Sequence, residues 1–447
     1  MNKFWGMLFV ISFCFSSVFC EADISVKNLP HSVEENASVI VSLGKDLYSK
    51  VNKGVYRIHV IDMVSSKKAS AGSAFFFRRD DILITNYHVV SQVVNYPDNY
   101  EIRWISPSGK EGIARLYAID LIHDISILKC CDELHNEEGV FVFDARKEDI
   151  SKGFKIFSLG NLFDRGVIIV DGLYNGIVEN SWYNRFLFSG AINPGMSGGP
   201  AIDVNGNLIG INVATEGNNV SYIVPTKFLV ELYENTVEND EYNPPSEGWL
   251  DVVEKQVAQY THKIVERLLA IKEWPKTDFD IALLPADIDP ALNVWTQNQD
   301  VRDSDAKQRI KVMKIYNNDY IFVVPDLLLG RLLIDYYLIT SLGYHNAVQF
   351  YKATPINMLY SPWITDKHIA PPVCKSDFVD VNGVNCKLFF CMRPLREFKS
   401  LYELSFSLVS LDFPKQILNS DINISGITKE DAIRLVERFL KEITWKR

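Results

Sequence analysis

Short β-type segments separated by turn residues fill the first half of the chain, between residues 55 and 225. Residues 73–77 and 81–85 flank a charged turn, and this pattern predicts a β-hairpin. Asn205-Gly206 marks another tight turn between apolar segments. Many short strands at this spacing predict a β-sandwich or β-barrels.

A different pattern begins after a polar stretch that contains two prolines, residues 239–248. Apolar residues at helical spacing between Val253 and Ile271 predict an amphipathic helix. Residues 320–325 look like a buried strand, and the apolar run at residues 327–342 looks like a second helix.

Two further signals near the end of the chain predict mixed α and β structure. Asn382-Gly383 lies between apolar segments and predicts a β-hairpin. Thr428 with Asp431 resembles a capping pair and predicts a final helix that runs to Trp445. We therefore expect residues 249–447 to form a separate α+β domain.

The 447-residue chain has room for roughly two or three domains. We predict a signal peptide at residues 1–20, a β-rich domain at 21–238, a linker at 239–248 and the α+β domain at 249–447. The signal peptide is indicated by Lys3 and the apolar run that follows it. A retained transmembrane anchor is the alternative for this segment. No later stretch has the length and apolar character of a membrane span, so we expect an exported protein with no stable span once the signal is removed.

The net charge of −10 argues against binding to nucleic acid or to an anionic membrane by bulk electrostatics.

Beyond the signal segment five cysteines remain: Cys130, Cys131, Cys374, Cys386 and Cys391. The last three either include a disulfide, as an oxidising compartment allows, or are buried thiols. Their spacing has no companion histidine in ligand register, so we expect no metal site. We also expect no cofactor.

Three segments of the β-rich region carry reactive side chains in a specific order. His88 follows an apolar strand, Asp124 directly precedes another, and Ser197 lies in a glycine-rich turn. A serine hydroxyl becomes a good nucleophile when a histidine takes its proton and a carboxylate orients that histidine. The order histidine, aspartate, serine is that of one known catalytic triad arrangement. Asp120 is the rival carboxylate, but it lacks a following apolar strand that would bury it.

Ser197 lies within residues 193–200, which read Asn-Pro-Gly-Met-Ser-Gly-Gly-Pro. Such a turn can expose a hydroxyl while its N–H groups converge on one point, as an oxyanion hole requires. We predict that the N–H groups of Gly195 and Ser197 form this hole. An ordinary Gly/Pro-rich β-turn is the alternative. His123 neighbours Asp124, and we expect it at the surface because adjacent strand residues face opposite ways.

These segments resemble the trypsin-like fold and, within it, the HtrA/Deg branch of exported serine proteases. The resemblance spans somewhat under half of the chain and rests on four segments: residues 72–75, 85–90, 120–129 and 193–200. It implies a mainly β protein in which a trypsin-like double β-barrel precedes the α+β C-terminal domain. It also implies a serine endopeptidase that acts on unfolded or misfolded protein, in the periplasm or as a secreted enzyme, in protein quality control.

The resemblance suggests a substrate pocket as well. Ala191 stands where relatives that prefer basic residues have an aspartate, so we expect no Lys/Arg preference. The pocket walls would come from Ala214, Thr215 and Val220, which suit a modest aliphatic side chain. The strand edge near Ala214 and Thr215 could pair with an extended peptide. Met196 replaces the family's usual asparagine, and no sign of the usual PDZ domain follows.

The unassigned second half leaves a second interpretation open. The trypsin-like domain could serve as a binding platform or scaffold while the C-terminal domain carries the main activity. Under either interpretation the expected partners are proteins or peptides, and a homo-oligomer is an open alternative.

Overall fold

The computed structural model describes residues 44–131, 140–215, 220–238, 245, 248–303, 306–341 and 364–446. The predicted signal peptide and most of the predicted linker lie outside these ranges. None of the helices within them has the length and apolar character that crossing a lipid bilayer requires.

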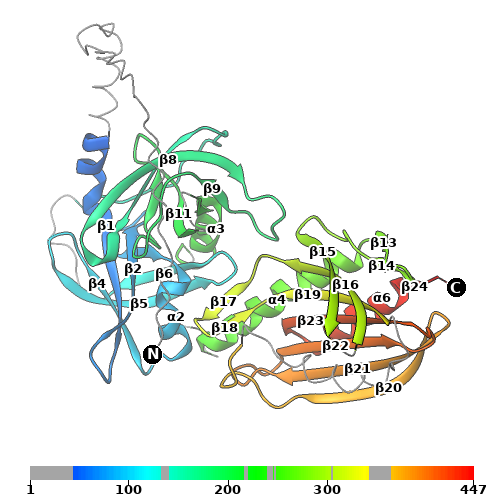
Figure 1. Cartoon of the computed structure of the whole chain (residues 1–447). Helices are drawn as coiled ribbons and strands as arrows, with labels where there is room; N and C mark the ends of the chain where they lie inside the picture. Colours follow the sequence, from blue (N-terminus) through cyan, green and yellow to red (C-terminus); the bar gives the residue numbers. More distant parts are fainter. Residues whose placement is uncertain are drawn as a thin grey trace, which may run out of the picture. The chain divides into compact units, whose positions relative to one another are not determined.

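The first β-barrel is closed by six strands in the order β1-β2-β3-β6-β5-β4 (Figure 1). Tyr56, Ile58 and Val60 alternate along β1, and all three are buried in the barrel core. Such alternation is what a strand with one core-facing side requires. The strands and helices are η2 Asn52–Gly54, β1 Val55–Asp62, β2 Lys68–Phe76, β3 Ile82–Thr85, α2 Tyr87–Asn95, β4 Tyr100–Ile105, β5 Glu111–Asp120 and β6 Ile125–Cys130.

The second barrel is also closed by six strands, in the order β10-β11-β12-β9-β8-β7. Its elements are β7 Lys155–Asn161, η3 Leu162–Asp164, β8 Val167–Ile177, β9 Phe186–Phe188, β10 Pro200–Ile202, β11 Leu208–Thr215, β12 Ser221–Pro225 and the following helix α3 Thr226–Thr236. Phe75 and Ile84 of the first barrel share one buried cluster with Leu159 and Ile211 of the second and Leu229 of α3. The predicted double β-barrel is therefore confirmed.

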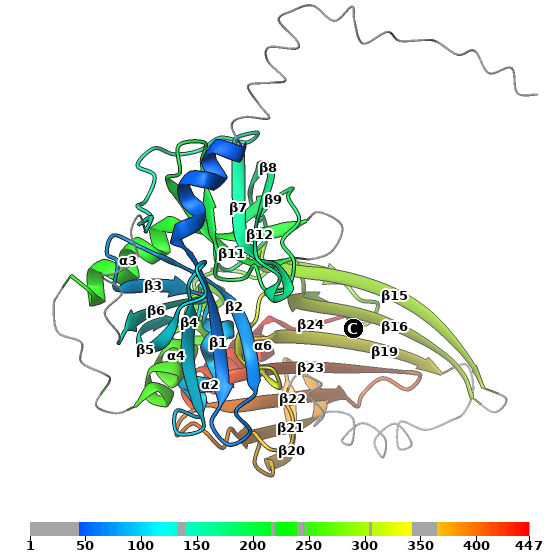
Figure 2. The same ribbon diagram turned by 90° about the vertical axis from the view of Figure 1, so that its left-hand side faces the viewer.

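The C-terminal region is built on a seven-stranded antiparallel sheet in the order β15-β16-β19-β23-β22-β21-β20 (Figure 2). Phe439 of helix α6 stacks on Tyr336 of β19 and meets Phe406 of β22 edge to face. Thr261 of helix α4 donates to the Gly426 carbonyl in β23 at 2.9 Å. Both helices therefore pack on this sheet, and the predicted mixture of helix and strand is confirmed with strands dominating.

The elements of this region are α4 Trp249–Leu269, β13 Lys276–Asp278, β14 Ala282–Pro285, β15 Leu292–Asp303, β16 Ala306–Asn317, β17 Ile321–Val324, β18 Leu327–Leu329, β19 Leu332–Ser341, β20 Val373–Val381, β21 Val384–Pro394, β22 Tyr402–Ser410, β23 Gln416–Ile427, α6 Lys429–Glu442 and β24 Thr444–Trp445. β13, β14 and β24 form a small sheet, and β17 pairs with β18.

One predicted element type and one predicted boundary in this region are wrong, and one predicted turn is right. The run predicted as a helix at residues 327–342 forms β18 and β19 over its described part, residues 327–341, since alternate residues from Leu332 to Leu338 face the core. The final helix ends at Glu442, and the chain then joins the small sheet. The hairpin at Asn382-Gly383 is present, with both turn residues in the left-handed region.

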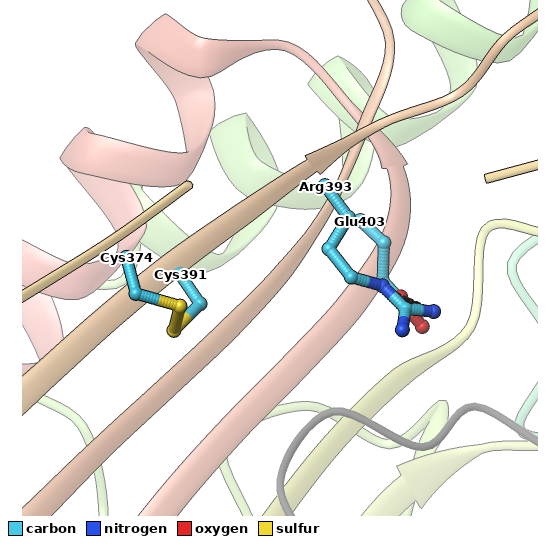
Figure 3. Close-up of a disulfide and its surroundings, with 4 residues drawn as sticks. All are labelled: Cys374, Cys391, Arg393 and Glu403. Atoms are coloured by element: carbon cyan, nitrogen blue, oxygen red, sulfur yellow. Dashed lines mark hydrogen bonds and ion pairs between the residues drawn. A yellow bond between two sulfur atoms is a disulfide. The ribbon is translucent and has the colours of Figure 1, made fainter. Parts of the chain in front are cut away.

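One disulfide joins Cys374 and Cys391, which are directly opposite each other on β20 and β21 (Figure 3). Nearby, the Arg393 guanidinium donates to the Glu403 carboxylate at 2.8 Å. Cys386 is a buried thiol, and burial raises its pKa to about 12. Of the two alternatives for these cysteines, the structure therefore contains the disulfide.

Candidate active site

His88 and Asp124 are joined by two hydrogen bonds. The His88 main-chain N–H donates to one carboxylate oxygen at 2.8 Å, and its ring Nδ1 lies 2.6 Å from the other. His88 is the second residue of α2, whose N-terminus follows β3 directly, while Asp124 ends the turn before β6. Asn86 donates to the Asp124 carbonyl at 2.8 Å and fixes the two segments together. This geometry orients the imidazole with its Nε2 away from the carboxylate.

Asp124 adopts a left-handed conformation, with φ at 58°. Aspartate tolerates this region better than most residues, although it is uncommon outside glycine. The conformation places the carboxylate so that both oxygens meet His88.

The rival carboxylate, Asp120, is engaged elsewhere. Its side chain lies 2.6 Å from the Nδ1 atom of His123. The His123 ring stacks on Phe228 with centroids 3.6 Å apart, so His123 is not the surface residue that we expected. The structure brings His88 together with Asp124 and not with Asp120.

The imidazole of His88 has an altered acidity. Burial lowers the pKa of His88, but the charge of Asp124 and its hydrogen bond outweigh burial and hold that pKa above its ordinary value. An imidazole beside a carboxylate is stabilised when it becomes charged, which suits a group that must accept a proton.

Ser197 lies in the turn before β10, at the junction of the two barrels. Its hydroxyl donates to the Val213 carbonyl at 2.9 Å. Within the described residues no hydrogen bond joins Ser197 to His88. Catalytic hydrogen bonds are often absent or long in unliganded enzymes, because they tighten when substrate binds.

The turn before Ser197 points its carbonyl groups at protein donors. The Pro194 carbonyl accepts from the Phe163 N–H at 3.2 Å, and the Gly195 carbonyl accepts from the Ser73 hydroxyl at 2.7 Å. Gly195 has φ at 93°, and a Cβ there would lie 2.3 Å from the Asn161 carbonyl oxygen. Among the described residues, no acceptor binds the N–H groups of Gly195 and Ser197.

Two buried polar residues that hold this turn were not predicted. The Ser73 hydroxyl, besides donating to Gly195, accepts from the Asn161 N–H at 2.8 Å. Asn212 donates to the Leu159 carbonyl at 2.8 Å and accepts from the Ser158 hydroxyl at 2.9 Å. Ser73 lies within one of the segments that carried the resemblance, whereas Asn212 lies outside all four. Only the three-dimensional structure shows what these two side chains bind.

The residues suggested for the substrate pocket come from adjacent segments. Ala191 lies beside Ile192, whose N–H donates to the Ser221 hydroxyl of β12 at 3.1 Å. Ala214 and Thr215 end β11 and pair with the start of β12, next to the exposed Val220. The backbone therefore brings these four positions to one end of the β11–β12 ladder.

The matches to known proteins include the region of the chain that forms the candidate site. The model of the trypsin-like peptidase domain matches residues 72–211. The probable periplasmic serine endoprotease DegP-like of Rhizobium meliloti is 29% identical over 206 residues, which are 44% of this chain and 38% of the relative. Its namesake from Bartonella henselae is 26% identical over 50% of this chain and 43% of its own length. The chain thus spans about two fifths of these relatives.

Solved structures align with a comparable share of this chain. The serine endoprotease from Yersinia pestis aligns with a TM-score of 0.37 at 19% identity, covering 43% of this chain and 65% of that one. Deg5 aligns with a TM-score of 0.36 at 21% identity, covering 45% of this chain and 94% of that one. The family match agrees with the double barrel, so the chain contains a trypsin-like peptidase domain, and this domain is similar to that of the DegP-like endoproteases.

Proposed function

We propose that the protein is an exported serine endopeptidase that cleaves peptide bonds through His88, Asp124 and Ser197. The observation that carries this proposal is the doubly hydrogen-bonded His88–Asp124 pair, together with a serine turn in which the N–H groups of Gly195 and Ser197 bind no acceptor among the described residues.

The proposed reaction begins with a rotation of the Ser197 side chain. Its hydroxyl leaves the Val213 carbonyl and donates to His88 Nε2, which then takes the proton as Oγ attacks the substrate carbonyl. Asp124 stabilises the imidazolium that forms. His88 then protonates the leaving amine. Water next attacks the acyl-enzyme while His88 takes its proton, and His88 returns that proton to Ser197 Oγ as the acid product leaves.

The N–H groups of Gly195 and Ser197 are the proposed donors to the oxyanion. Each such donor contributes roughly 3 kcal/mol to transition-state stabilisation, because it is already oriented when charge develops. The left-handed φ of Gly195 makes glycine the residue that this position requires.

Unfolded or misfolded protein segments are the proposed substrates. An extended peptide can add to the edge of β11 near Ala214 and Thr215, and an unfolded chain readily offers such a strand. Ala191 and Val220 are themselves apolar, which suits a small aliphatic side chain in the proposed pocket. Protein quality control is the role that such a preference would serve.

The proposed location is outside the cytoplasm, in the periplasm or in the secreted fraction. The Rhizobium and Bartonella relatives are named as periplasmic. The Cys374–Cys391 disulfide is of the kind that persists in oxidising compartments.

Cleavage of casein by the full-length protein tests the proposal. We expect Ser197→Ala to abolish cleavage, and the matched control Ser151→Ala, an exposed serine in the same domain, to retain it. Undiminished cleavage by Ser197→Ala would contradict the proposal. A protein with intact Ser197 that binds casein but cleaves nothing would favour the scaffold interpretation.

A further inference from the structure

The β17–β18 hairpin of the C-terminal region packs against the helix that carries His88. The Tyr87 hydroxyl and the Asn95 side chain, both on α2, donate to the Val323 carbonyl in β17 at 3.0 and 3.3 Å. All three residues are buried, so these bonds are shielded from water. Figure 1 shows the hairpin beside α2.

Phe322 of this hairpin lies next to the candidate catalytic imidazole. The centroids of the Phe322 and His88 rings are 6.2 Å apart, and the rings meet edge to face at 79°. Its neighbours Ile321 and Val323 are buried, because successive strand residues face opposite sides, whereas Phe322 keeps part of its surface exposed. An apolar ring thus remains accessible beside His88.

The segment before the hairpin is fixed to the second barrel by Asp319. Its carboxylate accepts from the Ser181 hydroxyl at 2.9 Å, from the Trp182 N–H at 2.6 Å and from the Arg185 guanidinium at 3.0 Å. Only 3% of the Asp319 side chain is exposed. These three donors lie in the connection between β8 and β9, so the hairpin is held by both barrels.

The tip of the hairpin is fixed as well. Asp326 lies between β17 and β18, and its carboxylate is 3.0 Å from Nε2 of the buried His368. The other ring nitrogen of His368 lies 2.5 Å from Glu397. A side chain whose supporting segment is fixed at both ends keeps its position, and a specificity pocket needs that rigidity.

We propose that Phe322 is a specificity-determining residue, whose ring forms part of the substrate cleft beside His88 and binds the side chain next to the scissile bond. The C-terminal region thereby takes part in choosing the cleavage site, with a preference for apolar side chains at that position. This inference rests on the proposed peptidase activity. Apolar contact of this size changes kcat/KM by about tenfold or more between a large and a small substrate side chain.

A set of peptides that differ only in the residues flanking the scissile bond tests this role in the full-length protein. We expect Phe322→Ala to lower the preference for a large apolar over a small residue at one flanking position by about tenfold. The control Phe378→Ala removes an exposed phenylalanine of β20 and should leave the preference unchanged. Labelling of Ser197 by a small fluorophosphonate, a probe with no flanking side chain, should stay within about twofold of wild type in the control Phe378→Ala.

A cleavage profile identical to wild type in Phe322→Ala would overturn the inference while the peptidase proposal stood. Absence of any cleavage by the wild-type protein would overturn the peptidase proposal, and the role of Phe322 with it. If Phe322→Ala does not fold, Phe322→Leu takes its place. Its preference among the same peptides is then compared with that of the wild-type protein, and an unchanged preference would overturn the inference.

Discussion

His88 and Asp124 form the most specific feature of the molecule at the scale of single residues. Two hydrogen bonds hold the imidazole to the carboxylate, and the second candidate carboxylate is bound to His123 instead. The sequence favoured Asp124 over Asp120 because an apolar strand follows Asp124, and the structure pairs His88 with Asp124. The prediction was wrong about His123, because stacking on Phe228 of α3 depends on a helix that is distant in the chain.

The pH dependence of activity should report the His88–Asp124 pair. His88 must be neutral to accept a proton, and Asp124 raises its pKa above the ordinary 6.5. As pH falls, kcat/KM should therefore decline with a midpoint above 6.5. Asp124→Asn should move this midpoint down and lower kcat by about 10⁴-fold. A wild-type midpoint well below 6.5 would contradict the assignment of His88 as base.

Gly195 and Gly109 provide a matched pair for testing the turn. Their φ angles are 93° and 92°, but a Cβ on Gly195 would clash with the Asn161 carbonyl, whereas one on Gly109 would meet nothing within 4 Å. Gly109→Ala should cost only the conformational strain, about 1 kcal/mol of unfolding free energy. Gly195→Ala should cost more and lower kcat by about 10²-fold or more, since the turn must shift.

Denaturant unfolding and steady-state kinetics of the two glycine variants make this comparison. Equal effects on stability and unchanged activity in Gly195→Ala would show that the turn does not need its observed conformation.

At the scale of elements, the connection between β8 and β9 depends on a carboxylate from the C-terminal region. Asp319 is almost fully buried and accepts from three donors of this connection, including Arg185. Removing one partner of a buried ion pair leaves the other charge uncompensated. Asp319→Asn should therefore lower the free energy of unfolding by about 3 kcal/mol.

Asp280→Asn is the control for this substitution, because the Asp280–Lys311 pair is exposed. Its loss should change stability by less than about 1 kcal/mol. Chemical denaturation of both variants decides the matter, and equal small effects would mean that Asp319 does not hold the connection.

Element prediction succeeded where one face of a segment is polar and failed where both faces are apolar. β1 alternates clearly, and the capping pair Thr428 and Asp431 does begin α6, with the Asp431 N–H donating to the Thr428 hydroxyl at 3.2 Å. In β19 the core-facing Tyr336 and Leu338 are separated by Tyr337, so the run resembles a helix as much as a strand. Pairing with β16 and β23, distant in the chain, resolves that ambiguity.

At the scale of the whole molecule, the first barrel and the C-terminal region share one buried core. The cluster includes Tyr87 and Val90 of α2, Val257 and Tyr260 of α4 and Leu329 of β18. Gln256 of α4 also donates to the Ile119 carbonyl and accepts from the Leu121 N–H. The sequence predicted two separate domains, but it contains no signal for contacts such as Tyr87–Val323 between residues 236 positions apart.

This shared core predicts that the two regions unfold together. Hydrogen exchange followed by mass spectrometry during heating should show β3 and β23 losing protection in one transition. A chain that ends at residue 245 should be less stable than the full protein, because it exposes the apolar side of α2. Two well-separated transitions in the full protein would instead mean that the peptidase domain is independent.

The central claim is that Ser197 is a nucleophile activated by His88. Fluorophosphonate labelling of the full-length protein, with the modified residue mapped by mass spectrometry, tests it most directly. The account predicts a single labelled position at Ser197, with labelling slowed by about 10³-fold or more in His88→Ala. Labelling of another residue, or equal labelling in wild type and His88→Ala, would contradict it.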